Sequence, residues 1–126
     1  MTQINSYIQV IDNSGIKIVK CLGNSYTNKS IHIKIGDSFL GSIKKLRKKY
    51  KINNLKKGDL VHCLLIQNKI FIKNSLNMTY IFHNNYCIIL NEHKLPLGTR
   101  ILCTILGEPF RLKKLYRILT IAKKVI

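Results

Sequence analysis

The chain has 126 residues and a mass of 14.6 kDa, the length of one domain. Its 22 Lys and Arg residues stand against only 5 Asp and Glu residues, so the formal net charge is +17, while 46% of the residues are hydrophobic. This apolar fraction excludes an intrinsically disordered chain, and the lack of a run of 18 uncharged apolar residues excludes a membrane-spanning helix. Because like charges repel one another in a compact chain, the composition predicts a polyanionic partner.

The first part of the chain has the pattern of short strands separated by polar turns. The tetrapeptide Asp12–Gly15 (D-N-S-G) predicts a turn, because Asx side chains bond their own backbone and glycine supplies a positive φ. Around it, apolar or alternating runs predict strands at Tyr7–Ile11, Ile16–Leu22, Ile31–Ile35 and Phe39–Ile43.

Residues 42–57 (SIKKLRKKYKINNLKK) form a basic segment, with eight Lys or Arg residues and no acid between Asp37 and Asp59. In a balanced protein such a run is often only a solvated face. Here the whole chain shares the sign of the run, and Lys and Arg gain free energy by displacing counterions from a polyphosphate. We therefore predict that a ribbon in this segment follows an RNA backbone, through Lys44, Lys45, Arg47, Lys48, Lys49 and Lys51.

The second part of the chain continues as strands and then changes period. After Gly107-Glu108-Pro109, apolar residues recur at three-to-four spacing, which predicts one or two short helices over residues 109–126. The many short strands predict a closed or nearly closed small barrel in a single domain, 1–126. The five acids all lie in or beside predicted turns, which favours structural roles for them. The strands of this part are predicted at Leu60–Ile66, Ile70–Lys73, Thr79–Phe82, Tyr86–Leu90 and Ile101–Leu106, with a hairpin joining the second to the third.

The sequence offers little for catalysis or metal binding. Its four cysteines have no C-x-x-C spacing and lie among Ile, Leu and Val, which predicts buried free thiols in a reducing compartment. His62 and Cys63 are neighbours on a strand, so their side chains point to opposite faces and form no dyad. No nucleophile elbow, phosphate loop or zinc motif occurs. We expect no enzymatic activity, no catalytic residue, no metal, no cofactor and no small-molecule substrate.

A series of short motifs runs along the whole chain. The first half contains V-I-D-N-S-G at Val10–Gly15, I-G-D at Ile35–Asp37, I-K-K at Ile43–Lys45 and L-K-K-G-D at Leu55–Asp59. The second half contains N-N-Y-C-I-I-L-N at Asn84–Asn91, P-L-G-T-R-I at Pro96–Ile101 and K-L-Y-R-I-L-T-I-A at Lys114–Ala122. In this order and spacing, the motifs resemble the universal L14 family of large-subunit ribosomal proteins.

The resemblance implies a mainly β fold: a five-stranded β-barrel with a protruding basic β-ribbon and one or two short C-terminal α-helices. It implies binding to large-subunit rRNA, contact with neighbouring large-subunit proteins, and bridges to the small-subunit rRNA. Independently of the resemblance, the basic residues are spread along strands and not gathered on one long amphipathic helix, so we expect no membrane partner. By matching position, we expect RNA contacts from Lys44, Lys45, Lys56, Lys57 and Arg100, with Lys114 and Arg117 facing RNA or the bridge partner. The alternative function is a free-standing basic barrel that acts as an RNA chaperone or translation factor.

Composition and departures from the family pattern bear on where the protein works. Ile, Lys and Asn, which have AT-rich codons, are abundant, whereas Ala occurs once, at Ala122, and this bias predicts an AT-rich genome. The loop that is basic and glycine-containing in the family carries only Lys69 and Lys73 here. Such divergence favours a mitochondrial, organelle-encoded protein of the matrix ribosome. The alternatives are the cytoplasm of an AT-rich bacterium and a plastid-type organelle.

Overall fold

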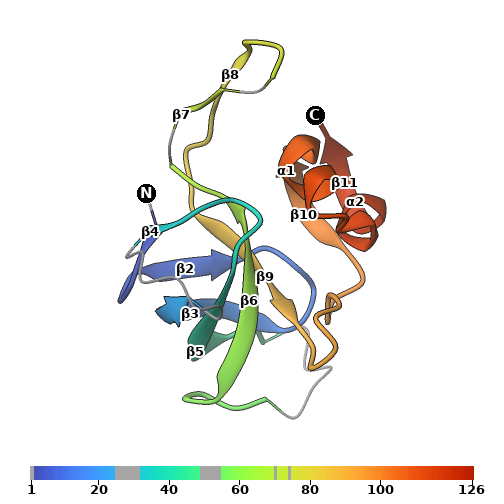
Figure 1. The fold of residues 1–126 in the computed structure, drawn as a ribbon. Coiled ribbons are helices and arrows are strands. Elements are labelled where there is room, and N and C mark those ends of the chain that lie inside the picture. The colour runs from blue at the N-terminus through green and yellow to red at the C-terminus, as the bar shows by residue number, and fades with distance from the viewer. Residues whose placement is uncertain (1, 25–31, 49–54, 70, 74) are drawn as a thin grey trace.

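The computed structural model describes residues 2–24, 32–48, 55–69, 71–73 and 75–126. Its centre is a closed barrel, in which β2 pairs antiparallel with β3 and parallel with β9, so that the sheet has no free edge there (Figure 1). The predicted five-stranded barrel is thus confirmed. Its strands are β2 (Tyr7–Val10), β3 (Ile16–Asn24), β5 (Ser38–Leu46), β6 (Leu60–Gln67) and β9 (Tyr86–Leu90).

Two small antiparallel pairs lie outside the barrel. One joins β1 (Thr2–Gln3) to β4 (His32–Ile33), and the other is a hairpin of β7 (Phe71–Lys73) and β8 (Thr79–Ile81) that projects at the top of Figure 1. The hairpin was predicted at this place. The strand predicted at Ile31–Ile35 is shorter in the structure, because residues 34–37 form a turn in which Asp37 N donates to Lys34 O.

The C-terminal residues form a separate layer on one side of the barrel (Figure 1). Strand β10 (Ile101–Ile105) is followed by the two predicted helices, α1 (Gly107–Leu112) and α2 (Tyr116–Ile121). The expected helical segment to residue 126 needs correction at its end. Residues Ala122–Val125 form strand β11, which pairs in parallel with β10. At Ala122 the backbone changes to an extended conformation, with φ −71° and ψ 143°. This conformation is stable because pairing with β10 gives the amides and carbonyls of β11 hydrogen-bond partners.

Two apolar clusters hold these layers together. The first fills the barrel and includes Phe39, Leu65 and Ile89. The second lies between the outer face of the barrel and the helices, and includes Ile66, Ile88 and Phe110. From Cys63 onward, β6 contributes alternate residues to the two clusters, as β9 does from Cys87, so both faces of these stretches are buried. This explains why their sequences, LVHCLLIQ and YCIIL, are nearly continuous apolar runs.

The cysteines are free, as predicted. All four lie among the described residues and none forms a disulfide; Cys21, Cys63 and Cys87 are buried, and Cys103 is half-buried. Burial raises the pKa of Cys21 to about 11 and that of Cys103 to about 12, and it raises the pKa of Cys87 well above its ordinary value.

We expect the native protein to resist thiol alkylation. The thiolate is the reactive species, and the raised pKa values of Cys21, Cys87 and Cys103 keep these thiols protonated at pH 8, while Cys63 is buried away from the reagent. Iodoacetamide at pH 8, followed by intact mass measurement, should add no group rapidly to the folded protein. In 6 M guanidinium chloride the same treatment should add four. Fast alkylation of the folded protein at any of the three barrel cysteines would contradict the buried placement.

Candidate RNA interface

The basic segment begins where β5 leaves the barrel. Phe39 and the run Gly41–Ile43 are buried, but the next residues, Lys44 and Lys45, are both exposed. Consecutive strand residues are both exposed only where neither face of the strand is covered. The strand still pairs with β3 up to its last residue. The β5 extension is therefore a ribbon base that presents lysines on both of its sides.

A tight turn brings two further lysines to the same place. Asp59 Oδ2 accepts a hydrogen bond from Lys56 N at 2.9 Å, and Gly58, with a φ of +88°, takes a left-handed conformation that side chains disfavour. Gly58 N donates to Ile43 O at 2.9 Å, directly before Lys44. We call Lys44, Lys45, Lys56 and Lys57 the ribbon-base cluster. All four are exposed, and none pairs with a carboxylate in the described part of the chain.

Arg47 behaves differently from the lysines around it. Its side chain is half-buried, and it donates hydrogen bonds to Val10 O at 2.7 Å and to Ile16 O at 3.4 Å. Its backbone amide donates to Gly15 O at 2.8 Å. The structure thus gives Arg47 a role within the fold, at the D-N-S-G turn. Lys48 is exposed, whereas Lys49 and Lys51 lie outside the described residues.

Arg100 is exposed on a loop that the D-N-S-G turn holds from the other side. Asn13 Oδ1 accepts hydrogen bonds from Thr99 N at 2.7 Å and from Arg100 N at 3.2 Å. Asn13 Nδ2 donates to Thr99 Oγ1 at 2.8 Å. A Cβ at Gly98 would lie 2.6 Å from Asn13 Oδ1, so any other residue there would displace the Asn13 carboxamide. The sequence indicated both motifs but not their contact, because Asn13 and Thr99 lie 86 positions apart in the chain.

Asp12 anchors the same turn in the interior. Its side chain is 2% exposed, and its carboxylate accepts hydrogen bonds from Ser14 N, Ser14 Oγ and Ile89 N. Burial raises the pKa of Asp12, although these hydrogen bonds and the charge of Arg47 act in the opposite direction. Through Ile89 the carboxylate ties the turn to β9. Asp12 is a structural acid, as its place in a turn predicted.

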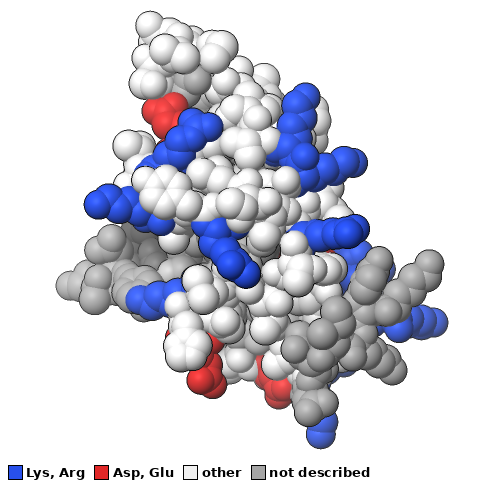
Figure 2. Space-filling view, turned by 90° about the vertical axis from the view of Figure 1, so that its right-hand side faces the viewer, with Lys and Arg blue, Asp and Glu red and all other residues white. Residues whose placement is uncertain are grey.

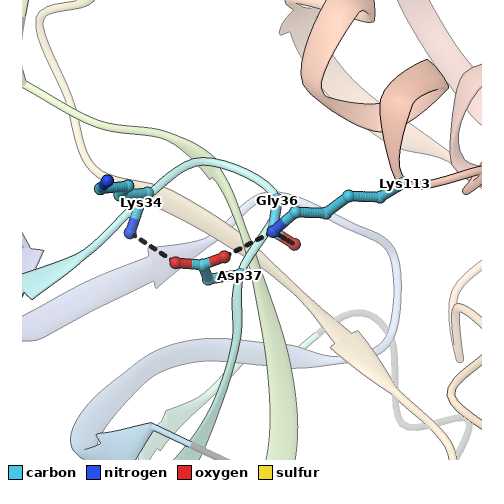
Figure 3. A network of polar contacts seen from close by, with 4 residues as sticks. All are labelled: Lys34, Gly36, Asp37 and Lys113. Atoms are coloured by element: carbon cyan, nitrogen blue, oxygen red, sulfur yellow. Dashed lines mark hydrogen bonds and ion pairs between the residues drawn. The ribbon is translucent and has the colours of Figure 1, made fainter. Parts of the chain in front are cut away.

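The C-terminal cations are carried by the helical layer. Lys114 follows α1 in a left-handed conformation with a φ of +57°, and Arg117 lies in α2; both side chains are exposed. The layer is tied to the barrel by Lys113, whose Nζ donates to Gly36 O at 3.1 Å and to Asp37 Oδ1 at 2.5 Å (Figure 3). Asp37 Oδ2 in turn accepts from Lys34 N. The I-G-D motif therefore fixes where α1 meets the barrel.

The acidic residues leave the cationic surface largely uncompensated. Asp12 is buried, Asp37 pairs with Lys113, Asp59 accepts from its own turn, and Glu108 accepts from Ser75 N. Figure 2, which views the molecule from the side of the C-terminal helices, shows Lys and Arg side chains spread over that face and acidic ones at few places. Such a surface suits a phosphate backbone, since lysines without partners gain most from displacing its counterions.

Other kinds of site find less support among the described residues. No three His, Cys, Asp or Glu side chains of that part of the chain converge as metal ligands would. Neither α1 nor α2 is long and apolar enough to cross a bilayer. The predicted RNA-facing residues that are described fall instead into three places: the ribbon base, the Arg100 loop and the helical layer.

Comparison with known proteins gives the family. The chain matches the family model described as "Ribosomal protein L14p/L23e" over residues 1–126. It is 37% identical over 108 residues to "Large ribosomal subunit protein uL14c" of Eimeria tenella, which covers 83% of this chain and 84% of the relative. It is 34% identical over 129 aligned residues to "Large ribosomal subunit protein uL14" of Petrotoga mobilis, which covers 99% of each. The chain therefore belongs to the L14p/L23e family of ribosomal proteins and is a structural protein of the large ribosomal subunit.

Proposed function

We propose that this protein clamps folded large-subunit rRNA through three groups of cations and stands near the subunit interface. The ribbon-base cluster carries most of the proposal, because its four exposed lysines have no carboxylate partner in the described structure. Arg100 forms a second contact. Lys114 and Arg117 form the third, directed at RNA or at a partner across the interface. Lys48, Lys49 and Lys51 extend the proposed contact along the basic segment, while Arg47 supports the ribbon from its base through its hydrogen bonds to Val10 O and Ile16 O.

The proposal requires a binding free energy dominated by phosphate contacts. Filter binding of the purified chain to transcribed large-subunit rRNA, between 50 and 200 mM KCl, should give a linear plot of log Kobs against log salt. Its slope should be about −0.7 to −0.9 for each phosphate contacted, hence steeply negative. Binding that hardly varies with salt would contradict a phosphate clamp. The native protein should also remain with the large subunit in a sucrose gradient after a high-salt wash, whereas a free-standing RNA chaperone would be released.

The partners follow from the same picture. The large-subunit rRNA and the neighbouring large-subunit proteins hold the barrel, and small-subunit rRNA meets it across the interface in the assembled ribosome. We propose no enzymatic activity, since the described site offers exposed cations and no convergent acid, base or nucleophile. Crosslinking of purified whole ribosomes through Arg117→Cys, a position on the exposed helical layer, should reach small-subunit rRNA if this layer forms a bridge. Crosslinks confined to the large subunit would contradict a bridge formed by this layer.

We place the protein on a mitochondrial ribosome and the gene in the organelle. The AT-rich coding bias and the loss of basic residues from the segment around Lys69 and Lys73 support this placement. The similarity to the Eimeria tenella and Petrotoga mobilis proteins keeps a plastid-type organelle and a bacterium as the alternatives. Ribosomes purified from fractionated organelles and analysed by mass spectrometry decide among the three.

A further inference from the structure

The D-N-S-G turn lies between two of the cationic groups, and it contacts the backbone next to each. On one side, Arg47 N donates to Gly15 O, and the Arg47 side chain donates to the carbonyls of Val10 and Ile16, which flank the turn. Arg47 follows directly on the β5 extension that carries Lys44 and Lys45. The turn is therefore packed against the base of the ribbon.

On the other side, the turn determines the shape of the Arg100 loop. Asn13 uses its whole carboxamide there: the oxygen accepts from two consecutive backbone amides, Thr99 N and Arg100 N, and the nitrogen donates to the Thr99 hydroxyl. Three hydrogen bonds to two residues leave that stretch of backbone little freedom to rotate. The Arg100 side chain remains exposed, so the bonds set its starting direction and leave its guanidinium available.

From this geometry we propose that Asn13 is a positioning residue for RNA binding, which directs Arg100 at a phosphate while the turn keeps the Arg100 loop in register with the ribbon base. The inference rests on the proposed function. Asn13 carries no charge and makes no phosphate contact of its own. Its contribution lies in the entropy that Arg100 would otherwise lose on binding, because ordering a loop and a long side chain costs free energy.

The test compares salt dependences, because these report the number of phosphates contacted. With the full chain and transcribed large-subunit rRNA as the probe, Arg100→Ala should make the slope of log Kobs against log salt less negative by about 0.7 to 0.9. Asn13→Ala removes no charge, yet it should make the slope less negative by a similar amount. The double variant should lose no more than either single variant. Gly98→Ala, which places a methyl group against Asn13 Oδ1, should reproduce the effect without altering Asn13 itself.

A matched control separates positioning from stability. Gln67 Nε2 donates to Thr104 O and links β6 to β10, away from the Arg100 loop. Gln67→Leu should lower the melting temperature but leave the salt slope unchanged, because the folded fraction still contacts every phosphate. The proposal is overturned if Asn13→Ala and Gly98→Ala keep the wild-type slope, or if Arg100→Ala does so. In both cases, a steep salt dependence of the wild-type chain would leave the proposed function standing. If the wild-type chain itself bound rRNA with little salt dependence, the proposed function would be contradicted as well.

Discussion

Replacement of the ribbon-base cluster by glutamate, in the variant Lys44→Glu/Lys45→Glu/Lys56→Glu/Lys57→Glu, should prevent incorporation into the large subunit. Each substitution changes the charge by two, so the formal net charge falls from +17 to +9. Loss of four phosphate contacts should make the slope of log Kobs against log salt less negative by about 3. It should also lower the affinity for rRNA by about 100-fold or more at physiological salt. The variant should fold normally, since all four side chains are exposed. Sucrose-gradient sedimentation of tagged protein measures the incorporation.

The control keeps the same charge change and moves it elsewhere. Lys69, Lys73, Lys94 and Lys123 are exposed and lie outside the proposed RNA contacts, and their replacement by glutamate also gives a net charge of +9. This control variant should still sediment with the large subunit. Its affinity for rRNA should fall slightly, because the lower net charge weakens long-range attraction while the direct contacts remain. Equal loss of incorporation in both variants would mean that net charge, and no particular surface, recruits the protein.

Asp12→Ala should cause the second large effect, this time on folding. Removal of the carboxylate leaves the amides of Ser14 and Ile89 without that acceptor and leaves Arg47 without its nearby opposite charge. Each buried donor that loses its partner costs about 1–3 kcal/mol, so we expect a loss of about 3–5 kcal/mol in the free energy of unfolding. That is a large part of the stability of a small domain. Urea denaturation followed by circular dichroism measures it. Asp59→Ala, which removes one exposed acceptor, should cost about 1 kcal/mol.

The sign of the pH dependence follows from the raised pKa of Asp12. The folded state holds this proton more tightly than the unfolded state, whose carboxyl titrates near 3.8. Stability due to this group is therefore fully present below about pH 4 and falls as the pH rises through the folded-state pKa. The difference in unfolding free energy between the wild type and Asp12→Ala should be larger at pH 4 than at pH 7. A difference that grows with pH would contradict burial as the dominant cause.

The strands were predictable because their signals are local. Alternation identified β2 and β3, the D-N-S-G turn separated these two strands, and unbroken apolar runs identified β6 and β9. Strand β11 was missed because A-K-K-V continues the preceding helical spacing. Only its ladder with β10, which is formed by chain some twenty residues earlier, makes it a strand. Tertiary pairing overrides local pattern in such short segments.

In the candidate site, too, local features were predictable from the sequence and long-range contacts were not. A run of lysines without acids is visible in any reading of the sequence, and the exposed ribbon-base cluster agrees with it. The special role of Arg47 was hidden within that run, because its partners are backbone carbonyls, which every residue has. Asn13 and Thr99 were visible as members of motifs, but the hydrogen bonds between them join distant parts of the chain. Local pattern gives the composition of a surface, whereas long-range contacts decide which of its members are free to bind.

Strands β6 and β9 belong to the barrel interior and also to the apolar layer beneath the helices. A rupture of either strand would expose both clusters to water at once. The barrel should therefore not open while the helices stay packed on it. The molecule should therefore lose its structure in one cooperative step, and thermal unfolding should show a single transition by every probe.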